Sequence, residues 1–264
     1  MRDKKKTRYT LMFLIFAAIF LYSAYTLTVY YVNAYRASRE FGSLRDLTGE
    51  ATPRPTPDEI FIPAPTPISW EIMPRFTELY ELNGEFVGWL KIYDTKIDYP
   101  VMQSSADDPF FYLHSNFNRS DDNNGTPFLD AQCSIRPNSG NCIIYGHNMR
   151  SGLMFHDLTK YIEKDFWDSH KYVLFDTLYS EGTYQIFAAF VFDVSKMTED
   201  SFRFFRPVDF SDEAEFEAFI AEIKNRALYD TGITPAFGDE LLTLSTCEYT
   251  TADGRFVVMA KRIA

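Results

Sequence analysis

The chain has 264 residues, of which 46% are hydrophobic and 17% aromatic, so it can bury a sizeable core in one or two domains. Its formal net charge is −11, but residues 1–10 alone carry +4, which leaves −15 on the remainder. An acidic body of this kind repels nucleic-acid phosphates and argues against a nucleic-acid-binding protein.

The first predicted element is a membrane anchor at residues 11–32, a run of 22 positions without a charge. A helix rises ~1.5 Å per residue, so this run can cross a hydrocarbon core of roughly 30 Å. The alternative is a cleaved signal peptide, but the apolar run is long and Tyr22 stands where a small residue is needed. The basic tail at residues 1–10 precedes the anchor, which predicts a single-pass membrane protein with a cytoplasmic N-terminus and an extracellular body.

A stalk and linker are predicted next, at residues 33–67. Residues 33–50 have the composition of a short polar helix or stalk, and residues 51–67 contain closely spaced prolines. Proline at that density favours extended polyproline II and acts as a semi-rigid spacer. The domain boundary is therefore placed at residue 68, with one domain over 68–264.

The domain begins with short elements. A helical pattern at 75–83 ends at Gly84, and the following runs predict strands at 86–92 and 97–103, a short helix at 107–114, an apolar segment at 127–129 and a β-rich run at 142–147.

The second half adds two helical pieces within 153–170 and strands at 171–176 and 183–194. In the latter strand alternate residues from Tyr184 to Phe192 are apolar, which predicts one buried face. An amphipathic helix follows at 211–228, with Ser211 or Asp212 as its N-cap, and the chain closes with strands at 241–247 and 255–263. Six to eight short strands indicate a small barrel or a sandwich, and pattern alone does not separate the two.

Three cysteines lie in the part of the chain predicted to be exported, where the environment is oxidising. They are Cys133, Cys142 and Cys247. An odd number cannot pair completely, so at least one is free, and a free cysteine is ordinarily an inert buried residue. Cys247 differs because it ends a strand between Thr246 and Glu248, a poor place for a core residue.

His147 and Arg255 are the residues most suited to act with this cysteine. His147 follows a β-rich run and Gly146 at the start of a loop, where scaffolds place functional side chains. Arg255 opens the last strand, so it lies at the same end of the sheet as Cys247 if the last two strands are neighbours. A Cys/His pair is a known nucleophile arrangement, and a guanidinium there can stabilise an oxyanion.

Metal and cofactor sites are not predicted. The sequence has no C-x-x-C or H-x-x-x-H spacing for structural zinc, and no phosphate-binding glycine loop. Catalysis without a cofactor is therefore expected.

Several motifs together resemble the class B sortases of Gram-positive bacteria. The motifs are TLSTC at Thr243–Cys247, IYGHNM at Ile144–Met149 and GRFVVMAK at Gly254–Lys261, in that order. Further similar segments are Gly88–Leu90, Ile97–Val101, Tyr112–Leu113 with Asn116–Phe117, and Gly125–Asp130. The resemblance covers about residues 75–264.

The resemblance implies a mainly β fold, a sortase-type eight-stranded β-barrel with N-terminal helices and an extra helix before the nucleophile strand. It implies a cysteine transpeptidase in which Cys247 attacks the threonyl carbonyl of a C-terminal sorting signal of the LPXTG or NPXTN type. His147 would act as acid and base, and Arg255 would stabilise the oxyanion. The acceptor would be an amine of a peptidoglycan precursor or of a pilin, and the clients would be secreted proteins.

Substrate-binding roles are expected for Ser245, on the strand face of Cys247, and for Tyr112 and Leu113. For Ser245 a barrel-lining hydroxyl is an equally good interpretation. Cys133 and Cys142 are interpreted as structural or incidental.

Two other functions remain open from the sequence. A secreted cysteine peptidase or wall hydrolase would use the same Cys/His chemistry with water as acceptor. A non-catalytic anchored binding module is the other, although it has no use for Cys247, His147 and Arg255 together.

Overall fold

The structure is a computed structural model that describes residues 2–49, 70–199, 201–248 and 253–264. The chain forms two compact units, one up to Glu40 and one from Phe41 to Ala264. The predicted proline-rich linker, residues 51–67, lies outside the described residues. The second unit contains the barrel and every predicted site residue.

The first unit is formed by helix α1 (Arg2–Leu47), which also extends into the second unit. Its stretch Lys6–Leu47 is long and apolar enough to cross a membrane, with a mean hydropathy of 2.0 over its most apolar 18 residues. Such an N-terminal helix is suited to be a membrane anchor or a signal. The predicted anchor at 11–32 lies within it.

The end of α1 belongs to the barrel unit, and it falls in the stretch 33–50 for which the sequence predicted a short polar helix or stalk. Phe41 and Leu44 are only 4% and 6% exposed, and the Phe41 ring packs edge-on against Tyr99 with 5.0 Å between ring centroids. Two apolar residues three positions apart share one helix face. So short a pair does not stand out in a polar stretch of sequence.

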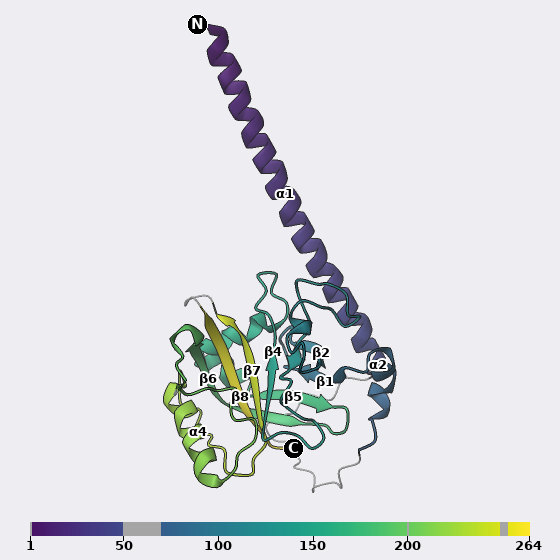
Figure 1. The fold of residues 1–264 in the computed structure, drawn as a ribbon, viewed down its shortest axis with the longest axis vertical. Helices are drawn as coiled ribbons and strands as arrows, with labels where there is room; N and C mark the ends of the chain where they lie inside the picture. Colours follow the sequence, from purple (N-terminus) through teal and green to yellow (C-terminus); the bar gives the residue numbers. More distant parts are fainter. Residues whose placement is uncertain (1, 50–69, 200, 249–252) are drawn as a thin grey trace. The chain divides into compact units, whose positions relative to one another are not determined.

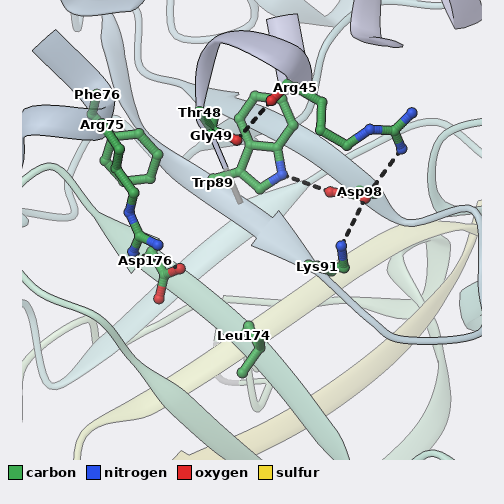
Figure 2. A pocket seen from close by; sticks show the side chains of 10 residues that line it. All are labelled: Arg45, Thr48, Gly49, Arg75, Phe76, Trp89, Lys91, Asp98, Leu174 and Asp176. Carbon is green, nitrogen blue, oxygen red and sulfur yellow. Dashed lines mark hydrogen bonds and ion pairs between the residues drawn. The ribbon is translucent and has the colours of Figure 1, made fainter. Parts of the chain in front are cut away.

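Asp98 fixes this helix end to the barrel. Its carboxylate accepts hydrogen bonds from Trp89 Nε1 at 2.7 Å, Lys91 Nζ at 3.1 Å and Arg45 Nη1 at 3.2 Å. Figure 2 shows the three donors converging on Asp98 beside a small pocket. The residue thus connects α1 with β1 and β2.

The barrel contains eight strands, as predicted, and the sandwich alternative is excluded. In chain order they are β1 (Phe86–Lys91), β2 (Asp98–Met102), β3 (Phe128–Leu129), β4 (Asn141–Tyr145), β5 (Tyr172–Thr177), β6 (Thr183–Asp193), β7 (Leu241–Glu248) and β8 (Gly254–Arg262). They close in the order β1-β2-β3-β4-β7-β8-β6-β5; all of them except β3 are labelled in Figure 1. The pairs β2/β3 and β4/β7 are parallel and the others antiparallel.

Short helices lie before the first strand and between the later ones. They are η1 (Pro74–Phe76), α2 (Thr77–Leu82), η2 (Phe111–Leu113), η3 (Phe155–Ile162), α3 (Lys164–Ser169), η4 (Val194–Lys196) and α4 (Glu213–Arg226). The helix predicted at 107–114 is only the single 3-10 turn η2. Pro109 disfavours helical backbone at Asp108, so the helix cannot begin where the polar residues suggested.

Helix α4 covers one outer face of the barrel, beside β6 and β8 in Figure 1. Asp212 is its N-cap, since its carboxylate accepts a hydrogen bond from Glu215 N at 2.9 Å. The helix and the strands form the α4 cluster, which consists of Phe187, Ala188, Phe190, Phe192, Phe204, Phe216, Phe219, Ile220, Ile223, Leu241, Val257 and Met259.

The α4 cluster explains why β6 departs from its predicted one-sided pattern. Residues from Ile186 to Phe190 are all buried, because one face of β6 points into the barrel and the other lies under α4. A register shift between Ile186 and Ala188 also interrupts the alternation.

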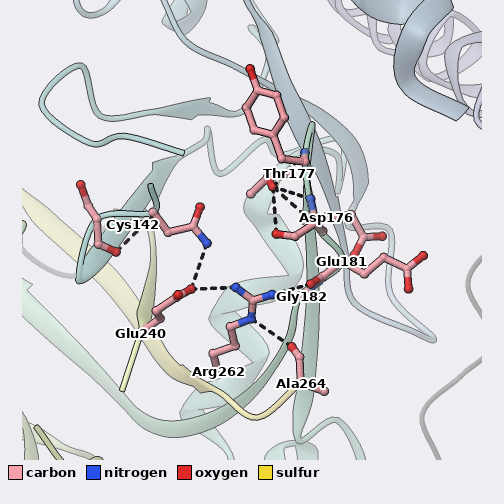
Figure 3. A network of polar contacts seen from close by, with 12 residues as sticks. Cys142, Asp176, Thr177, Glu181, Gly182, Glu240, Arg262 and Ala264 are labelled. Atoms are coloured by element: carbon pink, nitrogen blue, oxygen red, sulfur yellow. Dashed lines mark hydrogen bonds and ion pairs between the residues drawn. The ribbon is translucent and has the colours of Figure 1, made fainter. Parts of the chain in front are cut away.

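Arg262, near the end of β8, holds one end of the barrel together (Figure 3). Its guanidinium donates hydrogen bonds to Glu240 Oε2 at 2.8 Å, to the Glu181 carbonyl at 2.7 Å and to the Ala264 carbonyl at 3.1 Å. Cys247 on β7 and Arg255 on β8 lie together at the other end of these strands, away from Arg262. The hydrogen bonds of Arg262 therefore hold together the barrel end that is distant from the candidate site.

Candidate active site

Three neighbouring strands bring the predicted catalytic residues into a row. Strand β7 lies between β4 and β8, so the last two strands are neighbours, and Cys247 on β7 is directly opposite Arg255 on β8. On the other side the last pair of β4 and β7 is Tyr145 with Ser245, and the Gly146 amide donates to the Ser245 carbonyl at 3.1 Å. His147 therefore leaves β4 at the end of β7 where Cys247 lies. Neighbouring strands are about 4.8 Å apart. The order across the barrel end is His147, Cys247, Arg255.

The face on which Cys247 lies is the outer face of the barrel. Leu241 of β7 and Val257 of β8 belong to the α4 cluster, and residues two apart on a strand share a face. Cys247 and Arg255 therefore point to the same side as the α4 cluster, beyond its edge. Both are partly exposed.

Gly146 shapes the turn that presents His147. A Cβ at this position would lie 2.9 Å from the Phe155 ring, so only glycine lets that ring pack against the turn. The Phe155 amide in turn donates a hydrogen bond to the His147 carbonyl at 2.8 Å. The backbone of His147 is thus fixed from below by a buried aromatic residue.

The His147 ring is held by the carbonyl of Leu113, which lies 2.7 Å from Nε2. A carbonyl oxygen only accepts, so Nε2 carries a proton in this arrangement. Burial lowers the pKa of His147 below its usual value; the Leu113 carbonyl opposes this, and the nearby His114 adds to it. The neutral ring is therefore favoured at neutral pH.

Leu113 is positioned by the turn at Gly125. Gly125 has φ +62°, and a Cβ there would lie 2.6 Å from the Leu113 carbonyl oxygen. The Thr126 amide also donates to the Tyr112 carbonyl at 2.9 Å. The motif segments at 112–113 and 125–130 thereby meet behind His147, and Leu113 contacts the site through its backbone.

The Tyr112 side chain lies in the core and does not line an open substrate pocket. Its side chain is 0% exposed; its hydroxyl donates to Glu85 Oε2 at 2.6 Å and accepts from Asn83 Nδ2 at 3.0 Å. Tyr112 therefore supports the η2 turn from within the core. An influence of this residue on substrate binding would act through Leu113.

Two hydroxyls next to Cys247 lack a partner among the described residues. Ser245 Oγ and Thr246 Oγ1 are both buried and make no hydrogen bond there. Buried hydroxyls are nearly always bonded, and each exception calls for an explanation. Ser245 shares the strand face of Cys247, so its buried hydroxyl lies beneath the site without a partner in the part of the chain that the structure describes.

The other two cysteines are buried and free. Cys133 Sγ lies 3.4 Å from the Asn141 carbonyl oxygen, and burial raises its pKa to about 12. Burial likewise raises the pKa of Cys142. Both thiols stay protonated and unreactive at neutral pH, whereas Cys247 is partly exposed.

Asn148 is a site residue that the sequence reasoning quoted in a motif but did not single out. It is 8% exposed, and its Nδ2 donates to the Cys247 carbonyl at 3.0 Å. The signal that could have found it is a polar residue directly after His147 in a loop. Across the described ranges the structure contains no group of three His, Cys, Asp or Glu side chains that could hold a metal.

Comparisons with known proteins agree on one family. A model of the sortase domain matches residues 90–263. Sortase B of Listeria monocytogenes is 34% identical over 203 residues, which cover 76% of this chain and 78% of that protein. Sortase B of Staphylococcus aureus is 30% identical over 194 residues, covering 73% and 76%.

Solved structures agree with the fold. A sortase B from B. anthracis in complex with AAEK1 has a TM-score of 0.70 at 28% identity, covering 88% of this chain and 99% of that one. A Staphylococcus aureus sortase B–substrate complex has a TM-score of 0.65 at 29% identity, covering 74% and 87%. The eight-stranded barrel is thus of the sortase type.

Proposed function

Because the chain belongs to the sortase B family of cysteine transpeptidases, we propose that it cleaves a C-terminal sorting signal of the LPXTG or NPXTN type on secreted proteins. The threonyl carbonyl is then joined to an amine, of a peptidoglycan precursor or of a pilin. The observation that carries the proposal is the row formed by His147 just after β4, Cys247 on β7 and Arg255 on β8.

Cys247 is the nucleophile in this reaction. His147 takes the thiol proton as Sγ forms a bond to the threonyl carbonyl carbon, and it passes this proton to the leaving amine as the peptide C–N bond breaks. An incoming amine then attacks the thioester and gives a proton to His147, which returns it to the Cys247 sulfur as the C–S bond breaks. His147 is suited to both transfers because its neighbour Leu113 holds the ring.

Arg255 stabilises the negative charge that develops on the carbonyl oxygen. Its guanidinium is a rigid fork of donors; one of them bonds to the Gly254 carbonyl at 2.9 Å, which fixes the side chain near the strand. Residues directly opposite on antiparallel strands have Cβ atoms ~5 Å apart, within reach of one substrate carbonyl.

The residues expected to bind the substrate act on it from within the core. The Ser245 hydroxyl lies on the strand face of Cys247 but is buried, so Ser245 contributes by supporting the strand beneath the peptide. Leu113 and Tyr112 contribute by holding the loop at His147.

The membrane placement completes the proposal. The basic tail at residues 1–10 stays in the cytoplasm, α1 anchors the enzyme, and the barrel faces outward, where secreted clients and cell-wall precursors are found.

The reaction is tested with a sorting-signal peptide library and an added amine. The wild type should give a covalent peptide adduct on Cys247 by intact mass, and the amine should shift the product from acid to amide. Cys247→Ala should abolish both. If water remained the acceptor whatever amine was offered, the enzyme would be a cysteine peptidase, and full cleavage by Cys247→Ala would refute the nucleophile.

A thiol-labelling control uses the other cysteines. Iodoacetamide should modify Cys247 in the folded protein and leave Cys133 and Cys142 intact, because both are buried with raised pKa values.

A further inference from the structure

The side-chain amide of Asn148 connects the candidate nucleophile with a second histidine. Its Nδ2 lies 3.0 Å from the Cys247 carbonyl oxygen, and its Oδ1 lies 2.8 Å from His156 Nδ1. Asn148 is nearly fully buried and His156 is partly exposed. The chain of contacts therefore runs from η3, through the loop after β4, to the end of β7.

The partners determine the orientation of the amide and the tautomer of His156. The Cys247 carbonyl can only accept, so the NH₂ group of Asn148 must face it. The amide oxygen then faces His156 Nδ1, which must carry a proton. This proton is present on the neutral Nδ1–H ring and on the charged ring, so the connection does not depend on the charge of His156.

The hydrogen bond from Asn148 to the Cys247 carbonyl matters because of where Asn148 lies in the chain. Asn148 directly follows His147 in the chain, and it bonds to the residue proposed as the nucleophile. One contact therefore fixes the backbone of the proposed acid/base relative to the backbone of the proposed nucleophile. An isolated bridge between Asn148 and Met154 holds the loop from its other side.

His156 is itself anchored at the start of η3. Its amide donates to the Leu153 carbonyl at 3.3 Å, and its carbonyl accepts from Thr159 Oγ1 at 2.8 Å. The ring borders an open surface pocket lined also by Lys96, Gly152, Asp157 and Lys160. A rigid backbone thus aims the Nδ1–H group at Asn148.

We propose that Asn148 and His156 are positioning residues for the transpeptidation. Asn148 holds the Cys247 carbonyl, and His156 holds the Asn148 amide in the orientation that does so. The proposal rests on the proposed roles of Cys247 and His147, and neither positioning residue touches the reacting atoms. They act on turnover by keeping the nucleophile and the acid/base in register.

The test measures steady-state kinetics with a cleavable peptide and amine, together with melting temperature. Asn148→Ala and His156→Phe should each lower kcat by about 10- to 100-fold, the loss expected from misplacing reacting groups by about 1 Å. The KM and the melting temperature should change little. His170→Phe is the matched control, because the His170 ring bonds to the Phe166 carbonyl and makes no contact with the Asn148 amide.

Rescue and coupling separate positioning from general destabilisation. The amide nitrogen of Asn occupies the place of a histidine Nδ1, so His156→Asn should recover most of the rate, whereas the longer His156→Gln should not. The double variant Asn148→Ala/His156→Phe should be no slower than Asn148→Ala alone, since His156 acts only through Asn148.

The contrary results are equally specific. Normal kcat in Asn148→Ala, additive losses in the double variant, or losses that follow the melting temperature would each overturn the positioning role. The Cys247→Ala variant keeps the two proposals apart. If it is inactive while Asn148→Ala is normal, only the positioning role fails, and if it is active, the proposed function itself fails.

Discussion

At the residue scale, Arg255 shows how the position of a side chain in the fold changes the role expected of it. In the sequence it is one arginine at the start of a strand, and a surface role is the ordinary interpretation. In the structure it lies directly opposite Cys247 and shares its face with the edge of the α4 cluster.

Replacement of Arg255 by lysine should reduce turnover although the charge is kept. Lysine has no planar fork of donors, and loss of one oxyanion donor costs on the order of 100- to 1,000-fold in rate. Steady-state kinetics measure the effect, with Arg45→Lys as a control remote from Cys247. Near-normal turnover of Arg255→Lys would return this residue to a surface role.

The titration of His147 should have a midpoint below the ordinary value of about 6.5. Burial disfavours the charged ring, and His114 adds like-charge repulsion, so the pKa is lowered. An NMR titration of the ring measures it, and His114→Gln should raise the midpoint. A midpoint above that of a free histidine would contradict the burial argument.

The same lowered pKa has a consequence for stability. The unfolded chain binds a proton at His147 at a higher pH than the folded chain does, so protonation favours unfolding. The free energy of unfolding that the neutral His147 ring contributes is therefore fully present above a pH of about 6.5, and it is lost as the pH falls from there towards the pKa of the folded state.

At the scale of elements, strand existence could be predicted well from the sequence. Alternation and short apolar runs located β1, β2 and β4 to β8 close to their observed bounds. Helix η2 and the two-sided burial of β6 were not predictable in the same way. The first depends on local backbone geometry at Pro109, and the second depends on a helix packed from elsewhere in the chain.

Gly88 on β1 should be a position where alanine is poorly tolerated. A Cβ there would lie 2.3 Å from the Asp176 carbonyl oxygen on β5, which is closer than backbone atoms allow. Forcing extra volume into so close a contact costs about 1–3 kcal/mol of unfolding free energy. Urea unfolding of Gly88→Ala measures this cost.

Gly84→Ala is the matched control, since a Cβ at Gly84 meets no atom within 4 Å. Its unfolding free energy should change by less than about 0.5 kcal/mol. Equal destabilisation of the two variants would show that the close approach of β1 to β5 is not the reason why position 88 tolerates alanine poorly.

At the scale of the whole molecule, the asymmetric charge around α1 predicts its orientation. Basic residues before a membrane span stay in the cytoplasm, so the barrel should be extracellular. Protease added to intact protoplasts should degrade the unit Phe41–Ala264, and lysed protoplasts serve as the control. Protection of this unit until lysis would refute the orientation.

Catalysis should also proceed without a metal. Neither the sequence motifs nor the described side chains offer a metal-ligand group. Exhaustive chelation should leave turnover unchanged, measured before and after readdition of divalent ions. Recovery of activity by one specific metal would contradict this expectation.

The sequence by itself determined the long apolar N-terminal helix and the β-rich domain, and it singled out Cys247, His147 and Arg255 as candidate site residues. Those features are local in the chain, since they depend on runs of apolar residues, strand ends and short motifs. Tertiary structure alone decided that the barrel closes, that α1 joins it at Phe41, and that Asn148 bonds to Cys247 across the loop after β4. These contacts join segments far apart in the sequence, and their geometry exists only once the strands have paired.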